Sequence, residues 1–137
     1  MLGIENILSS FENIELALPA NVAYVATAKQ TAFSIAGRLG FDAMESHDIK
    51  IAVSEACAFL IKRLTGGGKT YKITFSVSNW HIHIRLSCPS AELANCGSGD
   101  CSLTPIRSLM DEIDIIDCDG LFEIVMSKRH IEGFVGT

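Results

Sequence analysis

Two neighbouring runs of alternating residues constrain the fold of this chain more than any other feature of its sequence. Every second residue is apolar from Tyr71 to Val77, and the same holds from Ile82 to Leu86. A period of two places the apolar side chains of a strand on one face. The polar pair Ser78-Asn79 separates the runs, which therefore predict an antiparallel hairpin with one face against a core.

The segment before this hairpin has the period of helices. Apolar residues recur at three- and four-residue steps over residues 22–39, and Gly40 supplies a C-terminal stop. The same steps continue over His47–Leu64, with Ser46 as the expected N-cap and the Gly66-Gly67-Gly68 run as the end. The apolar positions that follow this period in the first helix are Val22, Val25, Ala26, Phe33, Ala36 and Leu39.

The remaining elements are shorter and complete an α+β pattern. A strand is expected before the first helix, at Glu12–Leu18. After the hairpin we expect an aperiodic loop or lid at Pro89–Ser102 and a short helix at Leu103–Met110. Two strands should follow, at Glu112–Asp117 and Leu121–Ser127. This order predicts a two-layer sandwich of helices on one face of a mixed β-sheet. No repeat or linker divides the chain, so we expect a single domain over residues 1–137, in which residues 1–11 can be an extra extension.

Composition narrows the classes of function. The hydrophobic content is 48%, yet no apolar run reaches the roughly 18 residues that a membrane-spanning helix needs. The net charge is −5 without a basic cluster, which argues against direct binding to nucleic acid. The N-terminal residues lack the positive region of a secretory signal, and the five cysteines form no disulfide framework. We therefore expect a cytoplasmic protein with reduced thiols and no membrane contact.

Three motifs, in a fixed order along nearly the whole chain, resemble one protein family. Residues Lys50 to Cys57 look like the N-box helix of the anti-sigma-factor serine kinases, bacterial members of the GHKL or histidine-kinase-like ATPase superfamily. Residues 108–113, followed by Gly120 and residues 125–129, are similar to the C-terminal end of that family. Leu18-Pro19-Ala20 resembles its entry to the first helix.

The resemblance implies a fold and a role. The fold is the histidine-kinase-like ATPase (Bergerat) fold, in which ATP lies under a mobile lid. The role is partner switching in transcription regulation: such proteins bind a sigma factor or a STAS-domain anti-anti-sigma protein, whose serine they phosphorylate. The resemblance also implies a homodimer. Because fold does not carry function, the site has to be compared residue by residue.

Most positions that hold ATP in the family carry other residues here. In the family's Glu-x-x-x-Asn motif, the Glu is the general base and the Asn helps to hold Mg²⁺. Here Glu55 matches the Glu, but Phe59 stands at the position of the Asn. A phenyl ring offers no lone pair to a cation that demands oxygen ligands. The family's adenine-reading Asp-x-Gly-x-Gly motif falls on Leu86–Glu92, which has neither the Asp nor the glycines. Of the lid glycines, only Gly97 and Gly99 remain, out of register.

Two further family positions lie in the last part of the chain. Gly120 matches a glycine of the pocket, and Phe122 falls on a threonine. Phosphoryl transfer depends on positioning and charge neutralisation that the lost residues would supply. The sequence therefore predicts a pseudokinase, an anti-sigma regulatory factor-like protein that holds no cofactor, with Glu55 as a vestigial base and a degenerate pocket.

Other interpretations stay open at this stage. One is an active serine/threonine protein kinase that binds ATP and Mg²⁺ in a divergent pocket and uses Glu55 as its base. Another is a redox or small-molecule sensor with a cysteine-rich lid. A Zn²⁺ site is a further alternative, although its spacing matches no tight pair of ligands. Its candidate ligands are His81, His83, Cys88, Cys96 and Cys101. In a purely structural interpretation, Glu55 is a solvated helix residue and Phe59 belongs to the core.

Overall fold

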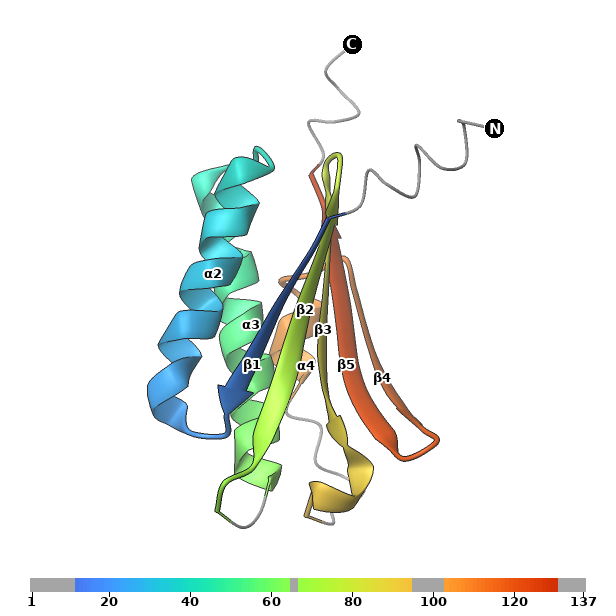
Figure 1. Ribbon diagram of the computed structural model, residues 1–137. Helices are drawn as coiled ribbons and strands as arrows, with labels where there is room; N and C mark the ends of the chain where they lie inside the picture. Colours follow the sequence, from blue (N-terminus) through green and yellow to red (C-terminus); the bar gives the residue numbers. More distant parts are fainter. Residues whose placement is uncertain (1–11, 65–66, 95–102, 131–137) are drawn as a thin grey trace, which may run out of the picture.

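The computed structural model describes residues 12–64, 67–94 and 103–130. Its strands are β1 (Glu12–Pro19), β2 (Thr70–Ser78), β3 (His81–Pro89), β4 (Glu112–Cys118) and β5 (Leu121–Arg129). Its helices are α2 (Val25–Arg38), α3 (Ala43–Arg63) and α4 (Thr104–Arg107), and the 3-10 turns are η1 (Val22–Tyr24) and η2 (Ser90–Glu92). Figure 1 shows a helix layer packed on one face of a sheet. The predicted two-layer α+β sandwich is confirmed.

The sheet is antiparallel throughout the described strands, whereas the sequence analysis expected a mixed sheet. The strand order is β1-β2-β3-β5-β4, and all four neighbouring pairs run antiparallel. β4 has the same direction as β3, but β5 lies between them and pairs with both. No helix within the described ranges is long and apolar enough to span a bilayer.

The predicted hairpin lines the core with the expected face. Ile73, Phe75 and Ile84 are fully buried, as are the other apolar residues that alternate with them. The turn is Asn79-Trp80, one residue later than predicted. Trp80 adopts a positive φ of 64°, which an asparagine or glycine favours more than a tryptophan does, so the residue type gave a misleading signal there.

Helix α2 packs with only part of the predicted apolar stripe. Ala36 is buried and Val25 and Leu39 pack against the core, whereas Val22, Ala26 and Phe33 are exposed. The buried residues of α2 are Ala28, Ala32, Ile35 and Ala36. Val22 is 72% exposed because the α-helix begins only after η1, and Phe33 is 40% exposed. Small alanines allow α2 to lie close to α3, so the larger side chain of Phe33 stays outside, where the Lys50 ammonium lies 5.3 Å from its ring centroid. The predicted stripe is therefore confirmed at Val25, Ala36 and Leu39 and wrong at Val22, Ala26 and Phe33.

Helix α3 begins four residues before the predicted start. Asp42 is the N-cap, and its carboxylate accepts a hydrogen bond from the Glu45 N–H at 2.7 Å. The Glu45 carboxylate accepts in return from the Asp42 N–H at 3.0 Å, which completes a capping box. Ser46, the predicted cap, is instead buried inside the helix. Two reciprocal bonds satisfy more orphan donors than a single serine cap, which explains the earlier start.

A buried histidine joins the N-terminal end of α3 to the sheet. His130 follows β5, and its Nδ1 lies 3.1 Å from the Glu45 carboxylate. Its ring packs between Phe41 and Trp80, with centroids 5.2 and 5.7 Å away. Its backbone N–H donates to the Trp80 carbonyl at 2.7 Å. One residue therefore connects the helix corner, the β2–β3 turn and the end of β5.

Candidate functional site

The C-terminal half of α3 carries the candidate site as a stripe of three residues at four-residue steps. Glu55, Phe59 and Arg63 lie one turn apart, so they share a face of the helix. Glu55 is exposed at one end of the stripe, whereas Phe59 and Arg63 are buried. The carboxylate of Glu55 forms no hydrogen bond or ion pair with a described residue, so it is free to meet an incoming group.

The ring of Phe59 is enclosed by a cation and by a second ring. The Arg63 guanidinium carbon lies 3.6 Å from the ring centroid, and its Nη1 donates to the Phe59 carbonyl at 3.1 Å. The Phe122 ring lies nearly parallel, with an interplanar angle of 8° and centroids 6.3 Å apart. We call Phe59, Phe122 and Arg63 the phenylalanine cluster. Ring pairs and buried cation–ring contacts each add about 0.5–2 kcal/mol beyond burial, so the cluster is a stable unit.

The structure thus brings together two positions that the sequence placed far apart. Phe59, which the sequence comparison aligned with the family's metal-ligand Asn, stacks on Phe122, which it aligned with a family threonine. Cys88 is the partner of Phe122 across the β3–β5 ladder and is buried. Burial, with Glu92 and Asp117 nearby, raises the pKa of Cys88 to about 11, so this thiol is neutral at pH 7.

A small cavity lies beside Phe59, between α4 and β4. Its volume is 180 Å³, below the 300 Å³ or so at which sites for drug-sized ligands begin. The residues that line it are Phe59, Leu103, Thr104, Arg107, Ile113, Asp114 and Ile115. Four of these seven residues are apolar, and the polar ones are Thr104, Arg107 and Asp114.

The remaining predicted site residues are distributed differently. Gly120 lies in the β4–β5 turn, where φ of +80° explains a glycine, and its carbonyl accepts a hydrogen bond from the Ser90 N–H at 2.9 Å. Gly97 and Gly99 lie outside the described residues. Sequence reasoning did not assign Arg63 to the site, although its place two turns after Glu55 on the same stripe was a usable signal.

The zinc alternative finds no support in the described ranges, where no group of three or more potential ligands lies together. His81 and His83 are neighbours, with ring centroids 4.2 Å apart. They alternate with buried Ile82 and Ile84 and so lie on the open face of the sheet. Cys88 is buried on the opposite face, so the sheet separates it from both histidines. Cys96 and Cys101 lie outside the described residues.

No protein-family model matches the sequence, but individual proteins do. The serine-protein kinase RsbW of Bacillus thuringiensis (strain Al Hakam) is 39% identical over 143 residues, which cover 88% of this chain and 87% of the relative. RsbW of Bacillus cereus (strain AH820) is 29% identical with the same coverage.

A solved structure resembles the fold. It contains the RsbU and RsbW domains of Rv1364c from Mycobacterium tuberculosis and superposes with a TM-score of 0.68 at 14% identity. The match covers 86% of this chain and 32% of that longer chain. Such low identity supports the fold alone. The sequence identity and the shared fold together lead to one conclusion: this chain belongs to the family of the serine-protein kinase RsbW, the anti-sigma-factor serine kinases.

Proposed function

We propose that this chain regulates transcription in the cytoplasm by binding a sigma factor or a STAS-domain anti-anti-sigma protein, without holding ATP or transferring phosphate. The observation that carries the proposal is the contact of Phe59 with Phe122 and Arg63. In the family's order, Phe59 falls on the Asn that helps to hold Mg²⁺ and Phe122 falls on a threonine, and Arg63 packs on the Phe59 ring. Protein binding needs the fold and its surface, which the chain retains.

The residues present do not fit Mg²⁺ and ATP. Mg²⁺ takes oxygen ligands in near-octahedral geometry, and the ring of Phe59 supplies none. Phe122 stacks on this ring, so an incoming phosphate would have to displace two packed aromatic side chains. At the end of β3 the neutral thiol of Cys88 stands in the segment where the family has its adenine-reading carboxylate. The cavity of 180 Å³ beside Phe59 is also small for a nucleotide.

Calorimetry with ATP·Mg²⁺ tests this part of the proposal. We expect no heat of binding and no change in melting temperature, since a ligand raises stability only in proportion to its affinity for the folded state. RsbW of Bacillus thuringiensis, measured under the same conditions, is the matched control. A micromolar dissociation constant for this chain would contradict the proposal. Co-purification of this chain with a sigma factor or STAS protein from its host tests the partner class.

An active serine-protein kinase is the second candidate function. Two observations favour it: relatives at 29–39% identity are named serine-protein kinases, and Glu55 is exposed on α3. Transfer of radiolabelled phosphate to a STAS-domain protein would establish this function. In that case Glu55→Gln should abolish transfer, whereas Glu15→Gln, on the far edge of the sheet, should leave it unchanged.

We also propose a homodimer. Its support is the group of exposed apolar side chains at and before α2, which a single chain leaves in water. These side chains are Val22, Tyr24 and Phe33. Sedimentation equilibrium of the full chain tests it: we expect twice the mass of 14.8 kDa, and a monomer at micromolar concentration would contradict it.

A further inference from the structure

Strand β4 forms an open edge of the sheet and is its most exposed strand. It pairs with β5 on one side only, and Figure 1 shows it at the outer side of the sheet. Six of its seven residues are exposed, and the seventh, Ile113, is half-buried. Ile115 and Ile116 are 45% and 41% exposed, and as consecutive residues of a strand they point to opposite faces. Both faces of this edge are therefore partly apolar.

The backbone of β4 offers hydrogen-bonding groups to its outer side. Asp119 and Gly120 both have positive φ, as in a two-residue hairpin turn of type I′, so Cys118 and Leu121 close the turn as a hydrogen-bonded pair. In an antiparallel ladder such pairs alternate with residues whose N–H and C=O point away from the partner strand. The residues whose backbone groups point outward from β4 are therefore Asp117, Ile115 and Ile113. Consistent with this, the Ile115 N–H donates to its neighbour's carboxylate, Asp114 Oδ1, at 3.0 Å.

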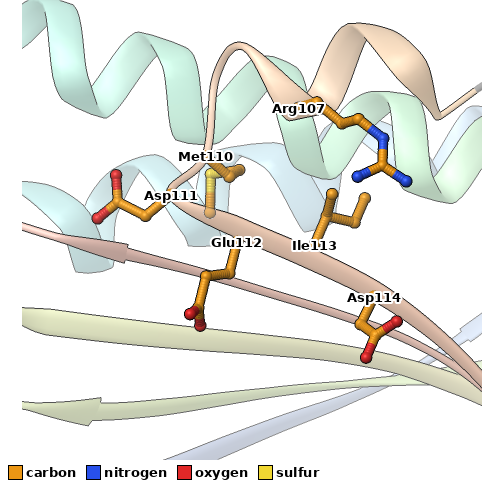
Figure 2. A pocket seen from close by; sticks show the side chains of 6 residues that line it. All are labelled: Arg107, Met110, Asp111, Glu112, Ile113 and Asp114. Atoms are coloured by element: carbon orange, nitrogen blue, oxygen red, sulfur yellow. The ribbon is translucent and has the colours of Figure 1, made fainter.

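This edge is negatively charged. Glu112, Asp114 and Asp117 form no ion pair with any described lysine, arginine or histidine. They accept hydrogen bonds from Ser127, Ile115 and Ser90, respectively. Figure 2 shows Asp111, Glu112 and Asp114 around a hollow of 430 Å³ beside the strand. Arg107 is the one cation among the residues that line this hollow. Carboxylates outnumber it three to one.

We propose that the outer edge of β4 binds an extended segment of another protein that carries lysine or arginine, which adds to the sheet as a sixth strand. An added strand would take up the outward backbone groups of Ile113, Ile115 and Asp117, as in other cases of strand addition. It would also cover Ile115 on one face and Ile116 on the other. Its cations would meet carboxylates that form no ion pair within the described chain and that outnumber the nearby Arg107.

A second copy of this chain is a poorer occupant of the same edge. Two β4 strands side by side would bring together six carboxylates, Glu112, Asp114 and Asp117 from each copy, and no cation. Like charges on neighbouring strands destabilise the pairing. The proposal does not depend on nucleotide binding, because none of the residues it uses belongs to the phenylalanine cluster. It therefore goes beyond the proposed function and can fail separately from it.

The test uses the full chain and a synthetic nine-residue peptide that alternates lysine and valine. We expect micromolar binding at low salt, weaker at high salt because surface charges are screened. In ¹⁵N-resolved spectra the amide signals of Ile113, Ile115 and Asp117 should shift and gain protection from exchange. Two control peptides should not bind: one with glutamate in place of lysine, and one with N-methyl groups on alternate backbone nitrogens.

Variants of the chain make the test specific to this edge. Asp114→Asn with Asp117→Asn keeps the shapes and side-chain oxygens and should weaken binding about fivefold to tenfold, as two lost surface ion contacts would. Ile115→Pro removes an outward donor that β5 does not use and should abolish binding. Glu12→Gln with Glu15→Gln, on the opposite edge strand β1, should have no effect. Equal binding of the glutamate peptide, shifts confined to β1, or an unaffected double asparagine variant would each overturn the proposal.

Discussion

The two ends of α3 use similar side chains in different surroundings. At the N-terminal end, the His130 ring lies between two aromatic rings and contacts the Glu45 carboxylate. At the C-terminal end, the Arg63 guanidinium lies on the Phe59 ring and donates to a backbone carbonyl. The first arrangement joins three elements of the fold, whereas the second packs the residue that the proposed function places at the family's metal-ligand position. The helix is thus anchored at one end and carries the candidate site at the other.

This difference indicates where the chain can change without losing its fold. The capping box and the Glu45–His130 contact fix the helix independently of the residues near Phe59. At the C-terminal end of α3, aromatic residues can therefore replace polar ones without loss of the fold, provided that the new side chains pack against their neighbours. Substitutions at the two ends should therefore have different consequences, which the following experiments measure.

The largest effect is expected from Phe59→Asn. This change leaves a cavity and buries an amide beside Phe122, so it should lower the free energy of unfolding by about 3 kcal/mol or more. It should restore neither ATP binding nor phosphate transfer, because the lost residues of the pocket act as a unit. The denaturant midpoint measures the first effect, and calorimetry with a radiolabelled-phosphate assay measures the second.

Phe59→Leu is the matched control. It keeps an apolar side chain and should cost less than Phe59→Asn, about 1.5 kcal/mol. If Phe59→Asn alone gave robust phosphorylation of a STAS-domain protein, the pocket would be intact apart from one metal ligand. The proposal of a non-catalytic regulator would then be wrong.

A smaller effect is expected at the anchored end. Glu45→Ala removes the acceptor of both the Asp42 N–H and the His130 Nδ1, so it should cost about 2 kcal/mol. Glu45→Gln keeps a side-chain oxygen in the same place and should retain most of the stability. Equal losses for the two variants would mean that charge, rather than hydrogen bonding, holds this end. Neither variant should alter peptide binding at β4.

The sequence predicted the architecture well where patterns were unambiguous. The alternation around residues 71–86 identified the central hairpin and its buried face, because only one side of that sheet is packed. The start of α3 was predicted at the wrong residue. Asp42 and Glu45 have the spacing of a capping box, but Ser46 is also a residue type that commonly caps helices, and the prediction chose it. The buried face of α2 was predicted only in part, because a close helix contact selects small residues, and Ala28 and Ala32 were not among the predicted apolar positions.

The site was predictable only in part, for a physical reason. Glu55 and Phe59 could be compared with the family one by one, but the sequence could not reveal that Phe59 and Phe122 stack on each other. That contact depends on how β5 lies beneath α3. Arg63 was overlooked because a charged residue on a helix usually faces water, whereas here a ring and a carbonyl receive it.

The smallest expected effect concerns Tyr71, which lies at the start of β2 near the site end of α3. Its hydroxyl is buried and makes no hydrogen bond of good geometry with a described residue, and its one interacting polar neighbour there is the weakly bonding thiol of Cys57. An unsatisfied buried hydroxyl costs free energy, so Tyr71→Phe should leave the stability unchanged or raise it by up to about 1 kcal/mol at pH 7. At the anchored end, by contrast, Glu45 and His130 have partners, and their removal should only destabilise. Thermal or denaturant unfolding of the wild-type protein and the Tyr71→Phe variant measures this difference in stability.

The pH dependence of the same variant sharpens the argument. Burial, and then the neighbouring Cys57, raise the pKa of Tyr71 above its ordinary value. The folded state therefore keeps this phenol neutral at pH values where the unfolded chain ionises it, so wild-type stability is full below about pH 10 and falls above it. Tyr71→Phe cannot lose stability in this way, and its advantage should grow as the pH rises past 10. Tyr24→Phe, at an exposed position, should show no such gain. A parallel decline of all three proteins above pH 10 would show that the Tyr71 hydroxyl is not held neutral by the fold.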